Sequence, residues 1–73
     1  MLIGNSTECH MMIVHATVSR HHCSIFRGES SYMIRDLDST NGTYVNDRRV
    51  KRAVLTPGDR VGLGRVSLVV SLE

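Results

Sequence analysis

The sequence of 73 residues contains no tryptophan, one phenylalanine and two tyrosines. Aromatic rings therefore cannot dominate the core, which must be built mainly from aliphatic side chains and methionine. No apolar run approaches the roughly 20 residues that a membrane-spanning helix requires. The first residues do not form the apolar segment of a signal peptide. A chain of this length supports one small domain of marginal stability, which we predict to span residues 1–73.

Charge of one sign and cysteine are also scarce. The formal net charge is only +2, which does not favour general attraction to nucleic acid or to membranes. Lysine occurs once, at Lys51, so the cations are almost all arginine, whose planar fork suits phosphate and carboxylate groups. A high-GC codon bias would explain the same preference. Cys9 and Cys23 are too few for a disulfide framework, so we predict reduced thiols in a cytoplasmic protein.

What the chain does contain is a series of short apolar segments separated by turn signals. Apolar spacing of three and four never persists, so the pattern predicts strands and no helix. Repeated short strands predict an all-β sandwich or barrel. The last strand is apolar and should pair within a sheet, because a free edge would aggregate. The predicted strands are Leu2–Ile3, Met11–Val14, Cys23–Arg27, Tyr32–Leu37, Thr43–Val45, Arg48–Val50, Arg60–Leu63 and Val66–Leu72.

The most informative segment is the polar run from Asp36 to Asn46. Within it, Asn41 and Gly42 predict a two-residue hairpin turn, because both residues tolerate positive φ angles. A second tight turn is predicted at Asn46–Asp47. The first turn is preceded by Asp, Ser and Thr, which a hairpin does not need. Surplus polar side chains in a loop held by a rigid sheet favour a binding function.

Three segments, taken together, resemble one known family. They are Ser19–His22, Ser39–Asn46 and Leu55–Gly64. The Ser-x-x-His and Ser-Thr-Asn-Gly-Thr motifs, in this order and spacing, resemble the forkhead-associated (FHA) domain, and the resemblance covers nearly the whole chain. It implies an FHA-like β-sandwich of short antiparallel strands. It also implies a signalling module whose loops bind phosphothreonine-containing proteins or peptides, the products of Ser/Thr kinases, in a bacterial-type signalling or secretion system.

The resemblance also assigns ligand contacts to individual residues. Ser19 would donate a hydrogen bond to the phosphate, and Arg20 would contact the same group. Thr40 would reach the phosphothreonine, and Asn41 would bind the peptide backbone beside it. Thr17 lies where the family tunes its preference for a residue downstream of the phosphothreonine.

Three further residues are expected to shape the loops. Gly4 would begin the first binding loop, and Gly42 would form the turn of the polar run. His22 would hold its loop in shape without touching ligand. Taken without the motif, Ser19 reads as a surface serine and Arg20 as a solvated cation, so the motif carries both assignments.

The sequence departs from the family pattern in two places. The family usually has a phosphate-clamping arginine after the glycine that corresponds to Gly4, and this chain has Asn5. Losing one charged hydrogen-bonding partner costs about 1.5–3 kcal/mol, so we include Asn5 in the predicted site as a weaker, neutral donor. The family also has two strands before the segment that corresponds to Leu2–Ile3. Their absence would leave a sheet edge uncovered and favour self-association.

Three other interpretations compete with this prediction. A degenerate FHA-like module would bind protein surfaces without phosphate. Paired carboxylates at Asp36 and Asp38 are compatible with catalysis, but no nucleophile–base pair accompanies them, so we predict no enzyme activity. Adjacent residues on a strand face opposite ways and cannot easily chelate one ion, so we predict no metal site and no cofactor. The side chains that could act as zinc ligands are Cys9, His10, His15, His21, His22 and Cys23.

Overall fold

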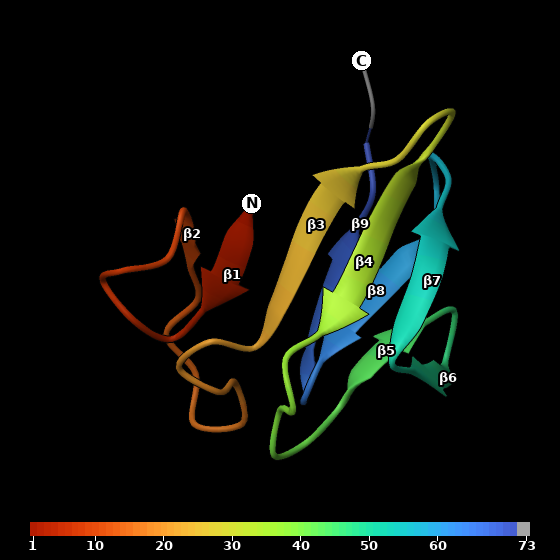
Figure 1. Ribbon diagram of the computed structural model, residues 1–73. Coiled ribbons are helices and arrows are strands. Elements are labelled where there is room, and N and C mark those ends of the chain that lie inside the picture. The colour runs from red at the N-terminus through yellow and green to blue at the C-terminus, as the bar shows by residue number, and fades with distance from the viewer. Residues whose placement is uncertain (72–73) are drawn as a thin grey trace.

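The computed structural model describes residues 1–71, and these residues form two packed β-sheets (Figure 1). The five-stranded sheet has the order β2-β1-β3-β4-β7, and the four-stranded sheet has the order β6-β5-β8-β9. The predicted all-β sandwich is therefore confirmed. Its strands are β1 (Leu2–Gly4), β2 (Met11–Met12), β3 (Cys23–Arg27), β4 (Tyr32–Asp36), β5 (Thr43–Val45), β6 (Arg48–Val50), β7 (Arg52–Leu55), β8 (Arg60–Leu63) and β9 (Val66–Val69).

The core between the sheets is aliphatic, as the composition predicts. Strand β4 shows the alternation that creates it, because Ile34 is fully buried between the exposed Tyr32 and Arg35 and the half-buried Met33 and Asp36. Within residues 1–71 no phenylalanine or tyrosine is among the buried residues. The buried apolar residues are Ile3, Val18, Cys23, Ile34, Val45, Leu55, Val61 and Leu63. Residues 1–71 contain no helix long and apolar enough to cross a membrane.

The prediction of a hairpin at Asn41–Gly42 is wrong. Strand β4 pairs with β3 and β7, whereas β5 pairs with β6 and β8, so residues 37–42 cross from one sheet to the other. Positive φ angles occur in this crossing at Asp38 (55°) and Gly42 (91°), but not at Asn41. Tolerance of positive φ marks where a chain can bend, while burial of the flanking strands decides which strands pair.

The second predicted turn is a true hairpin. Asn46 and Asp47 have φ angles of 49° and 69° and join β5 to β6 through the pair Val45–Arg48. Two consecutive positive φ angles give the turn whose twist matches that of the flanking strands.

Three further strand predictions need correction. Met11–Val14 shortens to β2, which pairs with β1 only through Ile3–Met11 and Gly4–Met12, and the last bond between them runs from the Ile13 N–H to the Gly4 carbonyl at 2.9 Å. Strand β7 was not predicted, and it pairs with β4 throughout its length. Not all neighbouring strands are antiparallel, since β1 and β2 run parallel. The predicted end of the last strand, Leu72, lies outside the described residues.

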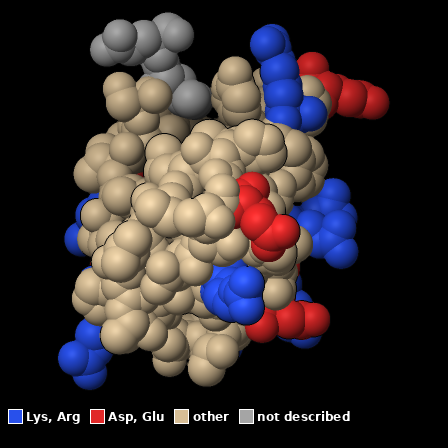
Figure 2. Space-filling view, turned by 90° about the vertical axis from the view of Figure 1, so that its left-hand side faces the viewer, with Lys and Arg blue, Asp and Glu red and all other residues tan. Residues whose placement is uncertain are grey.

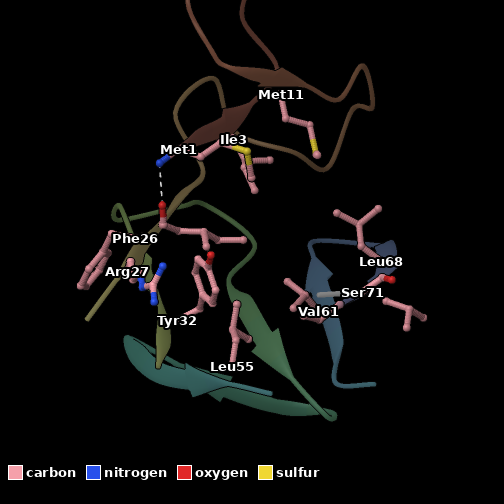
Figure 3. Close-up of a pocket in the computed structure, with 13 residues that line it drawn as sticks. Met1, Ile3, Met11, Phe26, Arg27, Tyr32, Leu55, Val61, Leu68 and Ser71 are labelled. Carbon is pink, nitrogen blue, oxygen red and sulfur yellow. Dashed lines mark hydrogen bonds between the residues drawn. The ribbon is translucent and has the colours of Figure 1, made fainter. Parts of the chain in front are cut away.

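One side of the sandwich leaves the space between the sheets open. A hollow of about 500 Å³ lies there, lined by Met1, Ile3 and Met11 on one wall and by Val61 and Leu68 on the other (Figure 3). Strand β9 pairs only with β8 within residues 1–71, so its outer edge has no strand partner there. The side that carries β1 and β2 is mostly uncharged (Figure 2).

Candidate functional site

Two loops that are far apart in the sequence meet at one end of the sandwich, namely residues 15–22 and residues 37–42 (Figure 1). The Thr40 N–H donates to Ser19 Oγ at 3.0 Å. The Asn41 side chain donates through Nδ2 to the Thr17 carbonyl at 2.9 Å. Each loop thus uses one polar side chain to hold the backbone of the other. The two motifs of the sequence form a single structural unit.

His22 is fully buried and holds the two loops together through hydrogen bonds of its ring. Its Nδ1 accepts a hydrogen bond from the Ser19 N–H at 3.0 Å. Because Nδ1 is an acceptor, the proton of the neutral ring is on Nε2, which donates to the Gly42 carbonyl at 2.8 Å. The imidazole therefore satisfies one backbone group from each loop. This geometry agrees with the structural role expected for His22.

Asp36 organises the second loop. Its Oδ1 accepts from the hydroxyls of Ser39 at 2.5 Å and Thr43 at 2.7 Å, and its Oδ2 accepts from the Ser39 N–H at 3.2 Å. Ser39 Oγ in turn accepts from the Gly42 N–H at 3.0 Å. Burial alone would raise the pKa of Asp36, but the hydrogen bonds from Ser39 and Thr43 outweigh it and hold that pKa below its usual value.

Gly4, at the end of β1, and Asn5, directly after it, hold residues 15–22 against β1. A Cβ atom on Gly4 would lie 2.1 Å from the Arg20 carbonyl oxygen, so only glycine allows this backbone approach. The Asn5 N–H donates to the Ser19 carbonyl at 2.9 Å, and the Asn5 side-chain nitrogen donates to the His15 carbonyl at 3.2 Å. Asn5 therefore lies against the backbone of the loop, with its amide donor engaged there.

A shallow pocket of about 330 Å³ lies where the two loops meet. Its lining comprises Ala16, Thr17, Val18, Ser19, Arg20, Thr40 and Asn41. Four predicted ligand-binding residues, Ser19, Arg20, Thr40 and Asn41, are thus brought together. Asn5 is not part of this lining. Hydroxyl groups and a guanidinium at one mouth suit an anionic ligand.

Thr17 links the pocket to a third segment, the turn between β8 and β9. Its Oγ1 accepts from the Arg65 N–H at 2.9 Å and donates to His15 Nδ1 at 2.8 Å. Nδ1 is the acceptor, because it also accepts from the Thr17 N–H at 3.1 Å. The sequence placed Thr17 in the site but gave no sign of Arg65, because the contact depends on packing between the two sheets.

The cysteine and histidine side chains that could ligate a metal do not line the pocket themselves. Within residues 1–71 no three His, Cys, Asp or Glu side chains come together as metal ligands. Cys9 Sγ donates to the Arg20 carbonyl at 3.2 Å. Cys23 is fully buried, and burial, aided by the negative charge of Asp36, raises the pKa of its thiol to about 12. Both cysteines are free thiols.

Comparison with known protein families places this geometry in context. The sequence profile of the FHA domain family matches residues 1–64. The chain is 38% identical over 66 residues to the oxoglutarate dehydrogenase inhibitor of Corynebacterium diphtheriae, which covers 90% of this chain and 46% of that protein. This chain spans less than half the length of this and other curated relatives that it matches.

Solved structures show the same similarity in three dimensions. One, from work on phosphothreonine-dependent FHA domain interactions, has a TM-score of 0.92 and 32% identity, covering 99% of this chain and 75% of that chain. Another is EmbR of Mycobacterium tuberculosis in complex with a low-affinity phosphopeptide. It has a TM-score of 0.90 and 30% identity, covering 96% of this chain and 19% of that chain.

Proposed function

This chain belongs to the FHA domain family, and we propose that it binds phosphothreonine-containing peptides through residues 15–22 and 37–42. The observation that carries the proposal is the hydrogen bond from the Thr40 N–H to Ser19 Oγ. This bond holds the two loops at one pocket. It also uses the Ser19 oxygen as an acceptor, so the hydroxyl proton is available to donate to a phosphate.

The pocket offers the donors that a phosphothreonine requires. Its phosphate carries a charge of about −1.5 to −2 and three strong acceptor oxygens. The Ser19 and Thr40 hydroxyls supply neutral donors, and the exposed Arg20 supplies a cationic fork. Asn41 commits its Nδ2 to Thr17, so its Oδ1 is left to accept a backbone N–H of the bound peptide.

Family membership supports the wider setting of this proposal. A module that binds phosphothreonine reads the products of Ser/Thr kinases, so we place the protein in cytoplasmic signalling. Its action is then binding rather than catalysis, with no cofactor. The contacting residues are Ser19, Arg20, Thr40 and Asn41, while Gly4, His22 and Gly42 shape the loops.

One observation favours a second candidate, a module that binds its partner without phosphate. Asn5 stands where the family usually has a clamping arginine, and its amide donor is engaged by the His15 carbonyl. Of the residues that line the pocket, Arg20 alone would then offer a cationic group to the phosphate. This arrangement predicts weaker phosphate recognition than a site with two guanidiniums.

A library of phosphothreonine peptides, each with its unphosphorylated counterpart, tests the proposal. We expect binding of phosphorylated members only, with competition by inorganic phosphate. Ser19→Ala should weaken that binding about tenfold and lower the melting temperature only slightly, because the Thr40 N–H that loses its partner is exposed and can bond to water. Ser30→Ala, in the exposed turn between β3 and β4, is the matched control and should bind normally.

Two results would decide against phosphate recognition. Equal affinity for both forms of a peptide would support the phosphate-independent module. A large loss of stability in Ser19→Ala would instead show that Ser19 serves the fold.

A further inference from the structure

Six side chains on the outer face of the five-stranded sheet form two rows that the binding loops do not use. Cross-strand partners share one face of a sheet, as do residues two apart along a strand. Ile34 in the middle of this region points the other way and is fully buried, so the six side chains face away from the core. We call them the outer grid: Ser24, Arg35 and Arg52 in one row, and Phe26, Met33 and Val54 in the next.

The two arginines of the outer grid lie directly opposite each other. Arg35 and Arg52 are register partners in the β4–β7 ladder, and both are exposed. Neither takes part in an ion pair within residues 1–71. Like charges in this arrangement repel, so the pair does not stabilise the sheet. Two neighbouring guanidinium forks do match a group of carboxylates, which each fork can bind in bidentate fashion.

Arg35 and Arg52 together leave the hollow that they line with one net positive charge. A shallow hollow of about 540 Å³ beside them is lined by Arg35, Asp36, Leu37, Asp38, Lys51 and Arg52, that is, by three cations and two carboxylates. The Asp36 carboxylate already accepts the hydroxyls of Ser39 and Thr43. Asp38 is exposed and forms no ion pair within residues 1–71. An added carboxylate would therefore be attracted to this end of the face.

The second row of the outer grid is apolar and accessible. Phe26 is 37% exposed and Val54 is 50% exposed, and Met33 lies between them in register. Arginine, aromatic residues and methionine are the types enriched at protein interfaces. An apolar row next to a basic row can hold both kinds of side chain of one partner segment.

We propose that the outer grid is a docking surface for an acidic segment of a partner protein, in which Asp or Glu residues stand beside an apolar residue. The carboxylates bind Arg35 and Arg52, and the apolar side chain packs on Phe26, Met33 and Val54. This docking does not require phosphate binding by the loops.

The position of the outer grid gives the docking a second consequence. Arg35 directly precedes Asp36, which holds the loop of residues 37–42, and β4 ends at the same end of the sandwich as that loop (Figure 1). A partner held at both places gains affinity because the second contact becomes intramolecular.

The test uses the whole chain, labelled for NMR, and a short unphosphorylated peptide that alternates Glu and Leu. We expect chemical-shift changes at the outer grid and none at Ser19, Thr40 or Asn41. A peptide that alternates Glu and Ser should bind more weakly, because it lacks the apolar contact. Changes confined to the loops, or no saturable binding, would overturn the proposal.

Matched charge variants separate recognition from simple attraction. The double variant Arg35→Gln/Arg52→Gln should weaken peptide binding about tenfold or more. It should melt no lower than the parent, because it relieves a repulsion. The control Arg48→Gln/Arg60→Gln removes the same formal charge from the other sheet, where it also breaks the exposed Arg60–Asp47 ion pair, and should bind within about twofold of the parent. Equal losses of peptide affinity in both double variants would show that only the net charge of the protein matters, and this would contradict the proposal.

The same kind of titration also tests whether the outer grid prefers another class of ligand. A duplex DNA fragment or vesicles of anionic lipid should bind more weakly than the Glu–Leu peptide and should not compete with it at equal charge. Tighter binding of either one to the outer grid would contradict a protein partner. Val54→Ser should weaken binding of the Glu–Leu peptide and leave binding of the Glu–Ser peptide unchanged. The opposite pattern would contradict the proposed apolar contact.

Discussion

The imidazole of His22 and the carbonyl of Gly42 lie 2.8 Å apart, and this hydrogen bond joins the two loops of the pocket through the core. The ring also accepts the Ser19 N–H on its other nitrogen. No water reaches this fully buried ring, so each lost contact would leave a polar backbone group without a partner. The same residue thus supports both the fold and the shape of the binding surface.

His22→Ala should therefore be strongly destabilising. Two buried hydrogen bonds and the ring volume are lost together, and we expect a cost of about 2–5 kcal/mol in the free energy of unfolding. Urea unfolding at constant temperature measures it. The neighbouring His21→Ala is the control, because His21 is exposed and contacts Glu8 only at the surface, so it should change stability by less than about 0.5 kcal/mol. Similar values for both variants would contradict a buried structural role for His22.

Asp36 should make stability depend on acid pH. Its pKa is lower in the folded protein than in the unfolded chain, so the unfolded state binds more protons as the pH falls. The stabilisation is complete above the unfolded carboxyl pKa of about 4 and is lost as the pH falls through the lower native pKa. Urea midpoints measured between about pH 2 and pH 6 should show this loss.

Comparison with Asp36→Asn isolates that contribution. The pKa of Asp59 is also lowered, by the Thr56 N–H and the Asn46 side chain, so the parent protein loses stability in acid from two sites. Asp36→Asn should be less stable than the parent at neutral pH, and its urea midpoint should fall less steeply as the pH is lowered. A fall as steep as that of the parent protein would mean that Asp36 does not titrate as described.

The sequence predicted much of this arrangement, and what it missed depends on contacts between sheets. The resemblance of the Ser-x-x-His and Ser-Thr-Asn-Gly-Thr motifs to the FHA family pointed to Ser19, Thr40 and Asn41, and the structure brings these three residues to the lining of one pocket. It gave the wrong path for the chain at Asn41–Gly42, since turn propensity is local and strand pairing is not. Strand β7 was missed because Val54 is apolar although exposed, so Ala53–Leu55 reads as a continuous apolar run and not as the alternation of a half-buried strand.

The Asp36 network could have been recognised only in part. Ser39 and Thr43 follow Asp36 at the spacing of a polar loop, but nothing in the sequence shows that both hydroxyls turn inward to one carboxylate. Likewise the approach of Arg65 to Thr17 joins residues 48 positions apart and follows from the packing of the two sheets.

Asn5→Arg should strengthen phosphopeptide binding by about tenfold if the first loop is shaped around phosphate, because it adds a charge-assisted donor. The change also removes the Asn5 side-chain bond to His15. Asn5→Ala separates the two effects, since it removes the bond without adding a charge. Isothermal titration with one phosphothreonine peptide compares the three proteins, and an arginine variant no tighter than the alanine variant would refute the prediction.

The two cysteines should differ sharply in reactivity. Burial raises the pKa of the Cys23 thiol to about 12, so almost none of it is thiolate at pH values near 8. Cys9 is only half-buried. Iodoacetamide should therefore add one group to the native protein, on Cys9, as peptide mass spectrometry would show. Cys9→Ser should remain unmodified until denaturant is added. Equal labelling of both cysteines in the native state would contradict the burial of Cys23.

The open side of the sandwich predicts self-association that depends on concentration. Within residues 1–71 the outer edge of β9 has no strand partner, it lies beside the apolar hollow, and Val69 is 68% exposed there. Exposed apolar edges pair with other chains unless a charge blocks them. Val69→Lys should therefore shift the protein toward monomer in sedimentation measurements over a range of concentrations. Val14 is 75% exposed and outside the lining of the hollow, so Val14→Lys controls for added charge and should associate like the parent. A parent protein that stays monomeric at every concentration would rule out association through this edge.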